Sequence, residues 1–294
     1  MHSNITSLLC ISVLALTISA CRKDPDVQEP KPEPVTYEVE ESAFNTSREG
    51  LSIGGRLYSP IGLEGRKPAA IYCHGLTGSY KETEDYARAA AKLGLVTCCF
   101  DFCGGHEGIS LSAGTRAENS ILTELADLTA VYDEIARRPD VDPSRIMVMG
   151  GSQGGLVAAM YAGYHPEKVL ALGLMFPAFN IPILVRMYVR LNYGGLENVP
   201  EYVYFNGAKI WHKYIVDAHG VYPYNFIGAF EGPVFMIHGD KDELVNVSYS
   251  KKAQELYKDA SLIVLEGQNH GFDAEGQAIA IDYMNDFIIK TLGL

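Results

Sequence analysis

The sequence predicts an α/β fold in which a mostly parallel, doubly wound β-sheet is covered by helices on both faces. Strand-like and helix-like segments alternate from Tyr37 onward in the 294-residue chain, a pattern typical of a sheet with helices on either side. Most of the strand-like segments are short, continuous apolar runs, as parallel strands buried on both faces should be. We therefore expect one α/β domain over residues 37–294.

The opening segments "TYEVEESAF" and "LSIGGRLYSP" alternate in the two-residue period of half-exposed strands and predict an antiparallel hairpin. Buried strands are predicted downstream at "AAIYCHG", "LVTCCFDF", "RIMVMG", "VLALGLMF", "PVFMIHG" and "SLIVLEG". Helices are predicted at residues 80–94, about 116–138, from about 153, 248–257 and about 274–292. Gly94 is the expected C-cap of the first of them.

Residues 177–232 interrupt this alternation. They contain no clean strand pattern but many aromatic side chains. A structureless loop of this length is improbable in a compact domain, so we interpret the segment as an inserted cap over the ends of the strands. Tyr188, Trp211 and Tyr214 are candidate substrate-binding residues, because such side chains offer an apolar face and a polar tip. The alternative is that these rings only form the cap's own small core.

Composition excludes one class of partner. The chain has 36 acidic and 24 basic side chains and a formal net charge of −12, with no block of Lys and Arg that could neutralise phosphates. We therefore expect no nucleic-acid partner. Cys73, Cys98, Cys99 and Cys103 show no metal-ligand spacing with His and are interpreted as small buried hydrophobic residues. A disulfide between Cys73 and one of the other three is the alternative in an oxidising compartment.

The N-terminal segment differs in character from the rest. Residues 1–20 are largely apolar and end in "ISA" before Cys21, and residues 21–36 are charged and rich in proline. The first part resembles a bacterial lipoprotein signal peptide, which implies acylation of Cys21 after cleavage. The second part reads as a flexible tether. We therefore expect a lipid-anchored protein of the bacterial cell envelope, in contact with membrane only through that anchor.

A glycine-rich turn carries the candidate nucleophile. Residues 150–154, "GGSQG", match G-x-S-x-G, follow the apolar strand "RIMVM" and precede a helical segment. This context is typical of a nucleophile elbow, which holds a serine hydroxyl above the sheet in a strained backbone conformation. The flanking glycines leave room for the helix to pass close to the strand. We therefore expect Ser152 to be the nucleophile.

A serine nucleophile needs a base to accept its proton and a carboxylate to orient that base. "HGDKDELV" ends one late strand and offers Asp242, with Asp240 as the second choice and Glu243 as a distant third. "EGQNHGF" follows the next strand and offers His270 as the base. The sequence therefore predicts Ser152, Asp242 and His270 as the catalytic set.

The oxyanion formed during acyl transfer needs preorganised N–H donors. We expect the backbone N–H of Gln153, next to the nucleophile, and that of Leu76, in the loop "CHGLTGS" after an early strand. His74 in that loop is interpreted as shaping the loop. No metal-ligand cluster and no dinucleotide fingerprint is seen, so we expect a mechanism without a cofactor or metal.

The set "HGLTG", "DFCGGHEGIS", "GGSQGG", "HGDKDELV" and "NHGF" resembles the α/β-hydrolase superfamily. Within it, the chain is most similar to bacterial cinnamoyl (feruloyl) esterases and to neighbouring hydrolases of the serine aminopeptidase and monoglyceride lipase types. Residues 101–110 depart from the usual D-x-x-G-H-G-x-S run, so the loop near the site could differ in shape. Prolyl-oligopeptidase-type peptidases are similar too, but typically have Tyr at the position of Gln153.

This resemblance implies a serine carboxylic-ester hydrolase that forms an acyl-enzyme on Ser152, with an aromatic hydroxycinnamoyl-type or other small acyl group beneath the cap. An acyltransferase that uses the same acyl-enzyme is one alternative, and an aminopeptidase or monoacylglycerol hydrolase is another. A surface-binding lipoprotein without turnover is the alternative from a different functional class.

Overall fold

A mixed β-sheet forms the centre of the fold in the computed structural model, which describes residues 35–106, 108–205 and 208–294. Eight strands of the described ranges form this sheet, in the order β1-β2-β4-β3-β5-β6-β9-β10. Their bounds are β1 Val39–Arg48, β2 Leu51–Pro60, β3 Lys67–Cys73, β4 Val96–Phe100, β5 Val141–Gly151, β6 Leu172–Met175, β9 Val234–Gly239 and β10 Ala260–Leu265. Strand β2 is antiparallel to both of its neighbours, β1 and β4, and the other neighbouring strands of these ranges are parallel. The predicted mostly parallel sheet with an opening hairpin is confirmed.

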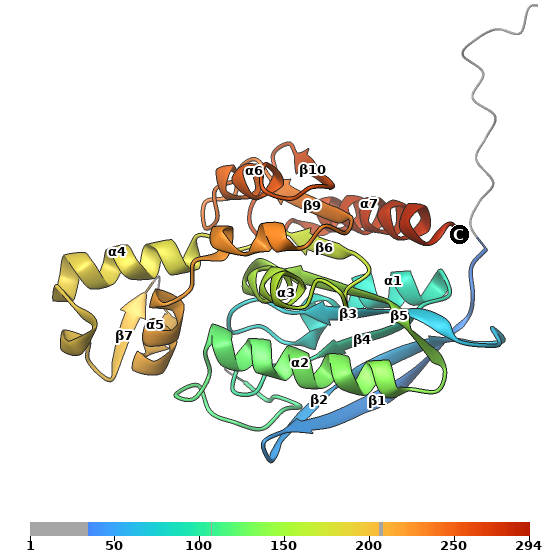
Figure 1. Cartoon of the computed structure of the whole chain (residues 1–294), viewed down its shortest axis with the longest axis horizontal. Coiled ribbons are helices and arrows are strands. Elements are labelled where there is room, and N and C mark those ends of the chain that lie inside the picture. Colours follow the sequence, from blue (N-terminus) through green and yellow to red (C-terminus); the bar gives the residue numbers. More distant parts are fainter. Residues whose placement is uncertain (1–34, 107, 206–207) are drawn as a thin grey trace, which may run out of the picture. The chain divides into compact units, whose positions relative to one another are not determined.

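Helices cover both faces of the sheet (Figure 1). Their bounds are α1 Glu84–Lys92, α2 Ile121–Arg137, α3 Ser152–Tyr164, α6 Ser248–Gln254 and α7 Ala274–Leu292. Side chains of α2 and α3 share one core with Ile71 of β3, whereas those of α1 and α7 share the other core with Tyr72. Since neighbouring residues of a strand point to opposite faces, β3 contributes to both cores.

Helix α2 begins five residues later than the sequence predicted. Ser120 is its N-cap: the Ser120 side chain accepts from the N–H of Thr123, while the Thr123 side chain accepts from the N–H of Ser120. This reciprocal capping satisfies two of the donors that a helix start leaves free. The helix therefore begins at Ile121, not near residue 116.

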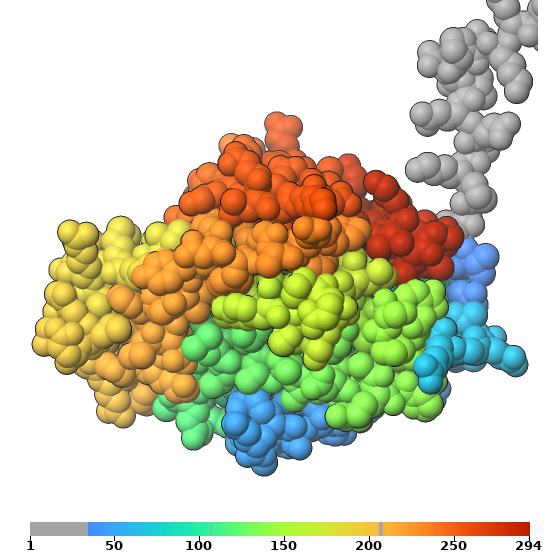
Figure 2. Space-filling view, in the orientation of Figure 1, coloured from blue at the N-terminus to red at the C-terminus, as the bar shows by residue number. Residues whose placement is uncertain are grey.

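The predicted cap, residues 177–232, is a separate group of elements between β6 and β9 (Figure 1). It contains α4 Ile181–Tyr193, β7 Tyr202–Phe205, β8 Ala208–Trp211 and α5 His212–His219. In Figure 2 its yellow and orange atoms form one end of the visible surface. The expectation of no strand in this segment is wrong, because β7 and β8 pair as an antiparallel hairpin. The sequence does carry a signal for it, the Asn-Gly dipeptide between two apolar runs, which is a strong hairpin-turn signal.

The signal-peptide prediction for residues 1–20, Cys21 and nearly all of the 21–36 tether lie outside the described residues. Within the described ranges, we find no helix that is both long and apolar enough to cross a membrane. The interpretation of Cys73, Cys98, Cys99 and Cys103 is confirmed, since all four are buried and unbridged.

Candidate active site

Ser152 stands at the sharp turn between β5 and α3. Its backbone φ is 52°, in the left-handed region that residues other than glycine rarely adopt. The glycines beside it give the clearance that the sequence predicted. A Cβ at Gly150 would lie 2.3 Å from the carbonyl oxygen of Gly154, and a Cβ at Gly154 would lie 2.3 Å from that of Cys73. The turn therefore packs directly on the backbone at the end of β3.

Gly154→Ala is expected to destabilise the fold. The new methyl group would meet two backbone carbonyls, those of Cys73 and His74, within 2.4 Å. Overpacking costs about 1–3 kcal/mol, and backbone atoms that cannot move aside place this change at the upper end of that range. The thermal unfolding midpoint, followed by circular dichroism, should fall by about 5 °C or more. Gly220→Ala is the matched control, because its nearest atom would lie at 3.6 Å. Equal midpoints for the two variants would contradict this packing argument.

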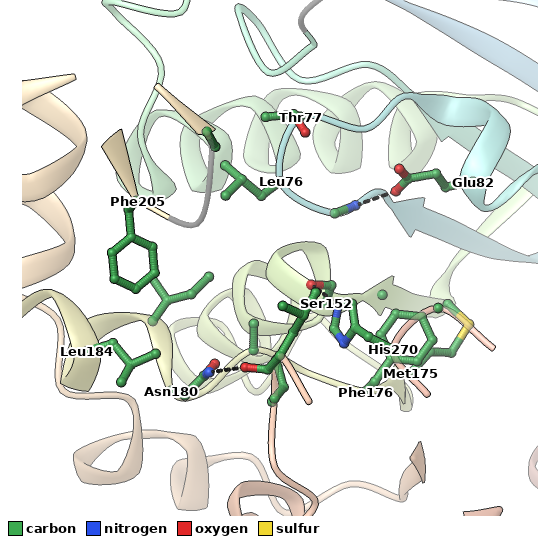
Figure 3. A pocket seen from close by; sticks show the side chains of 18 of the residues that line it. Leu76, Thr77, Glu82, Ser152, Met175, Phe176, Asn180, Leu184, Phe205 and His270 are labelled. Atoms are coloured by element: carbon green, nitrogen blue, oxygen red, sulfur yellow. Dashed lines mark hydrogen bonds between the residues drawn. The ribbon is translucent and has the colours of Figure 1, made fainter. Parts of the chain in front are cut away.

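His270 and Asp242 reach Ser152 from the loops that follow β10 and β9. The Ser152 hydroxyl lies 2.9 Å from Nε2 of His270, and Nδ1 of His270 lies 2.7 Å from Oδ2 of Asp242. Figure 3 shows Ser152 and the His270 ring side by side in the pocket. The structure thus brings together the three residues that the sequence singled out. The arrangement can pass a proton from a serine hydroxyl to an imidazole held by a carboxylate.

The Asp242 side chain is fully buried and saturated with hydrogen bonds. Oδ1 accepts from the N–H groups of Leu244 and Val245 at 3.0 and 2.8 Å. Oδ2 accepts from His270 and also lies 3.1 Å from Nε2 of His238. Burial alone would raise the pKa of Asp242, but the hydrogen bonds from His238 and His270 outweigh it and lower the pKa. The carboxylate therefore stays ionised and aimed at His270.

His238 is part of the site, although the sequence did not single it out. Its Nε2 lies 2.7 Å from the carbonyl oxygen of Val245, which can only accept, so Nε2 carries a hydrogen. Nδ1 lies 2.8 Å from the hydroxyl of Ser250 on α6. His238 is the last residue but one of β9, four positions before Asp242. A histidine at a strand end close to the acid was the only signal available in the sequence.

The other two acidic candidates make different contacts. Oδ1 of Asp240 accepts from the N–H of Gly267. The Glu243 side chain is exposed, and its backbone N–H donates to Asn269. Only Asp242 among the three is hydrogen-bonded to His270 within the part of the chain that the structure describes. The geometry therefore agrees with the choice of Asp242.

One predicted oxyanion donor, Gln153, follows Ser152 in the chain, and the other, Leu76, lies in the loop after β3. Gln153 is the second residue of α3, where helix geometry leaves the N–H without a partner inside the helix. Leu76 follows Gly75, whose Cα is so close to the nucleophile that a Cβ there would lie 3.3 Å from Cβ of Ser152. Leu76 also lines the pocket next to Ser152 (Figure 3). Both residues thus lie close to Ser152, and the role of their N–H groups as oxyanion donors stays a prediction.

Three hydrogen bonds hold the loop that carries Leu76. The Glu82 carboxylate accepts from the N–H of Gly75 at 2.9 Å, a bond drawn in Figure 3. The N–H of Phe102 donates to Nε2 of the buried His74, so Nδ1 of His74 carries the hydrogen and donates to the Gly75 carbonyl. Burial lowers the pKa of His74, which favours this neutral ring. His74 therefore shapes the loop, as the sequence predicted.

The loop at residues 101–110, which departs from the family pattern, supports the same region. The Asp101 carboxylate accepts from the N–H groups of Tyr80 and Leu111, both at 2.7 Å. Nδ1 of His106 lies 3.1 Å from the carbonyl oxygen of Thr77. Glu107, the extra acidic residue of this loop, lies outside the described residues. Residues 101–106 and 108–110 thus belong to a loop that contacts the Leu76 loop through Asp101 and His106.

A cavity of about 710 Å³ opens over Ser152 between the strand ends and the cap. This volume lies within the range of small-molecule sites. On the cap side the lining is apolar and includes Ile181, Leu184, Val185, Phe205, Ile210 and Ile215. Phe176, another residue missed by the sequence analysis, packs its ring against His270 with 4.8 Å between ring centroids. Ser152 therefore faces a chamber of small-molecule size whose cap side is apolar.

The structure separates the three aromatic cap candidates. Tyr188 and Tyr214 line the cavity, as expected, but the Tyr214 hydroxyl donates to the side chain of Gln153. The prediction for Trp211 is wrong, because Trp211 is absent from the lining. Strand β8 alternates, so Ile210 faces the cavity while Trp211 packs on Tyr202 at the opposite face of the hairpin.

The described ranges hold no group of three or more His, Cys, Asp or Glu side chains arranged to bind a metal ion.

Comparisons with known proteins agree with this fold. Residues 65–210 match the family model described as "Serine aminopeptidase, S33". The ferulic acid complex of Est1E from Butyrivibrio proteoclasticus superposes with a TM-score of 0.77 and 24% sequence identity, over 85% of this chain and 100% of that chain. The monoacylglycerol lipase of Mycolicibacterium smegmatis is 25% identical over 76% of this chain and 88% of its own length.

Other relatives are much longer than this chain. The acylamino-acid-releasing enzyme of Arabidopsis thaliana is 24% identical over 51% of this chain, which spans only 20% of that enzyme. The similarity to this enzyme therefore concerns one part of a larger protein, and the activity of the whole enzyme does not transfer to this chain.

Proposed function

We propose that this chain, which belongs to the α/β-hydrolase superfamily, hydrolyses carboxylic esters through an acyl-enzyme formed on Ser152. The observation that carries the proposal is the continuous hydrogen-bonded path from the Ser152 hydroxyl through His270 to the buried carboxylate of Asp242. Such a path converts a weakly nucleophilic hydroxyl into one that can attack a carbonyl.

In the first half of the reaction, His270 accepts the Ser152 proton at Nε2 while Oγ attacks the ester carbonyl. The resulting oxyanion is met by the N–H groups of Gln153 and Leu76. Asp242 stabilises the imidazolium, which then gives its proton to the departing alcohol as the acyl–oxygen bond breaks. In the second half, water takes the place of the alcohol, His270 again accepts and returns a proton, and the carboxylic acid leaves.

We propose an aromatic, hydroxycinnamoyl-type acyl group, or another small acyl group, as the part of the substrate that lies beneath the cap. The apolar lining from α4 and the β7–β8 hairpin supports this choice, since an aromatic ring gains most from leaving water in such a chamber. The ferulic acid bound in the similar Est1E structure supports it as well. The acyl class is an inference from these two observations together.

The test compares purified wild-type protein on methyl ferulate, p-nitrophenyl acetate, a monoacylglycerol and an aminoacyl amide, with kcat/KM measured for each. The proposal expects methyl ferulate to have the highest value among the unactivated substrates. A higher kcat/KM for the monoacylglycerol or for the amide would favour the lipase or the aminopeptidase alternative.

Product analysis with water and an added alcohol in competition separates hydrolysis from acyl transfer. Failure of Ser152 to react with a fluorophosphonate probe would support the non-catalytic alternative.

We also propose that the mature protein is lipid-anchored in the bacterial cell envelope through Cys21, on the basis of the sequence pattern alone. Cys21→Ser removes the only thiol in the proposed acylation box, so the variant is expected to move from the membrane fraction to the soluble fraction of cells. Cys10→Ser is the matched control, since Cys10 lies inside the segment that would be cleaved. A Cys21→Ser protein that still sediments with membranes would contradict the anchor.

A further inference from the structure

A buried polar network lies behind the nucleophile and is not used in the steps described above. At its centre is the side chain of Gln153, whose Nε2 donates to Oε2 of Glu124 on α2 at 2.7 Å. Its Oε1 accepts from the hydroxyl of Tyr214 on the cap helix α5 at 2.5 Å. Nδ2 of Asn119 donates to Oε1 of Glu124 at 3.1 Å. The network therefore joins α2, α3 and the cap.

All four side chains are removed from solvent, with Gln153 and Glu124 no more than 1% exposed. Burial raises the pKa of Glu124 to about 7, against the hydrogen bonds from Gln153 and Asn119, which favour the ionised form. Burying a carboxyl group costs stability unless its partners are well placed. The free-energy cost of burying Glu124 beside the nucleophile suggests that the network has a role besides packing.

The side chain of Gln153 is not free to contact a substrate, because both ends of its amide already have partners. Its backbone N–H is the donor we assign to the oxyanion. The amide side chain and this N–H belong to the same residue in the first turn of α3. The contacts that fix the Gln153 side chain therefore also restrict the position of its N–H group.

Tyr214 ties this residue to the cap. Helix α5 makes a second polar contact with α2 close by, in which the Ser120 hydroxyl donates to Oδ2 of Asp217 at 2.5 Å. Tyr214 also lines the cavity with its ring while its hydroxyl points to Gln153. The same cap helix that forms a wall of the substrate chamber is thus bonded to the residue next to the nucleophile.

We propose that Gln153 is a positioning residue whose side chain, held between Glu124 and Tyr214, couples the seating of the cap to the placement of its own N–H toward the oxyanion. This inference rests on the proposed function. A donor that contacts only the oxyanion acts in the transition state and not in the ground state, so disturbing it lowers kcat and leaves KM nearly unchanged. Removal of one oxyanion donor lowers kcat by about 10²- to 10³-fold, and a donor that is only displaced should lower kcat by less.

The test is Tyr214→Phe, which removes one hydroxyl and keeps the ring that lines the cavity. We expect kcat to fall about tenfold for both p-nitrophenyl acetate and methyl ferulate, with KM within about twofold of wild type. The inhibition constant of a trifluoromethyl ketone, whose adduct carries the same oxyanion, should rise by the same factor as kcat/KM falls. Tyr132→Phe is the matched control, because Tyr132 is a buried tyrosine of α2 whose hydroxyl bonds the Lys168 carbonyl.

A second variant, Glu124→Gln, approaches Gln153 from the other side. Because both variants act through the same side chain, their combined effect should be smaller than the product of the single effects. Independent effects, a change in KM alone, or a loss confined to methyl ferulate would overturn the coupling and leave Tyr214 as an ordinary binding residue.

Fluorophosphonate labelling of wild-type Ser152 separates this inference from the function on which it rests. Labelled wild type with an unaffected Tyr214→Phe variant overturns the coupling alone. Wild type that is not labelled overturns both.

Discussion

Ser152→Ala is expected to reduce kcat for p-nitrophenyl acetate by about 10⁵- to 10⁶-fold, because the covalent step has no other nucleophile and the set acts as one unit. The fold should be retained, since alanine is smaller than serine and the Ser152 hydroxyl makes its side-chain hydrogen bond with His270. The measurements are steady-state kinetics and the circular dichroism spectrum of the purified variant. The fluorophosphonate label should be lost at the same time.

Ser261→Ala is the matched control, because Ser261 is exposed at the start of β10, far along the chain from the turn. His270→Ala should be as inactive as Ser152→Ala, and combining the two changes should add little, since removal of either member disables the unit. A single variant that turns over p-nitrophenyl acetate at the wild-type rate would refute the assignment of that residue as nucleophile or base.

The large elements of the fold could be predicted from sequence because each has a local cause. Helix α7 was predicted at its observed bounds, since its apolar spacing is regular and Asp273 caps its start. The errors arose where the local pattern was weak. The start of α2 depends on a single capping serine, Ser120, and the four-residue strands of the cap are too short for alternation to stand out.

The candidate site could be assembled from sequence for a topological reason. The carboxyl ends of parallel strands meet at one edge of a sheet, so residues placed just after β5, β9 and β10 converge although they are far apart along the chain. Topology alone therefore predicts that Ser152, Asp242 and His270 meet. The roles of His238, Glu124 and Phe176 depend on which buried side chains face one another after packing, so topology does not predict them.

Trp211 was wrongly predicted to bind substrate, because the sequence does not show which face of the hairpin it occupies. Composition identified it as a ligand-binding type of residue, but only the register of β8 decides which face of the hairpin it occupies. In the structure Lys209 lies 4.1 Å from the Trp211 ring centroid, on the face away from the cavity. A one-residue change of register would have placed it in the chamber.

The contacts of Asp242 determine what an asparagine at this position can do. Oδ1 accepts two backbone N–H groups, from Leu244 and Val245, which cannot reverse their polarity. In Asp242→Asn the carbonyl oxygen of the amide must therefore occupy the Oδ1 position. The NH₂ group then replaces Oδ2 and faces Nδ1 of His270, which now has to accept a hydrogen bond.

Asp242→Asn is accordingly expected to lower kcat by about 10⁴-fold. An imidazole that accepts at Nδ1 carries its hydrogen at Nε2 and cannot take the Ser152 proton. Asp240→Asn is the matched control: Oδ1 of Asp240 accepts from Gly267 N–H, and an asparagine oxygen can keep that bond, so its kcat should stay within about threefold of wild type. Steady-state kinetics on p-nitrophenyl acetate checks both variants. If Asp240→Asn were the more impaired, the acid of the site would be Asp240, and the short contact between Asp242 and His270 would have no part in catalysis.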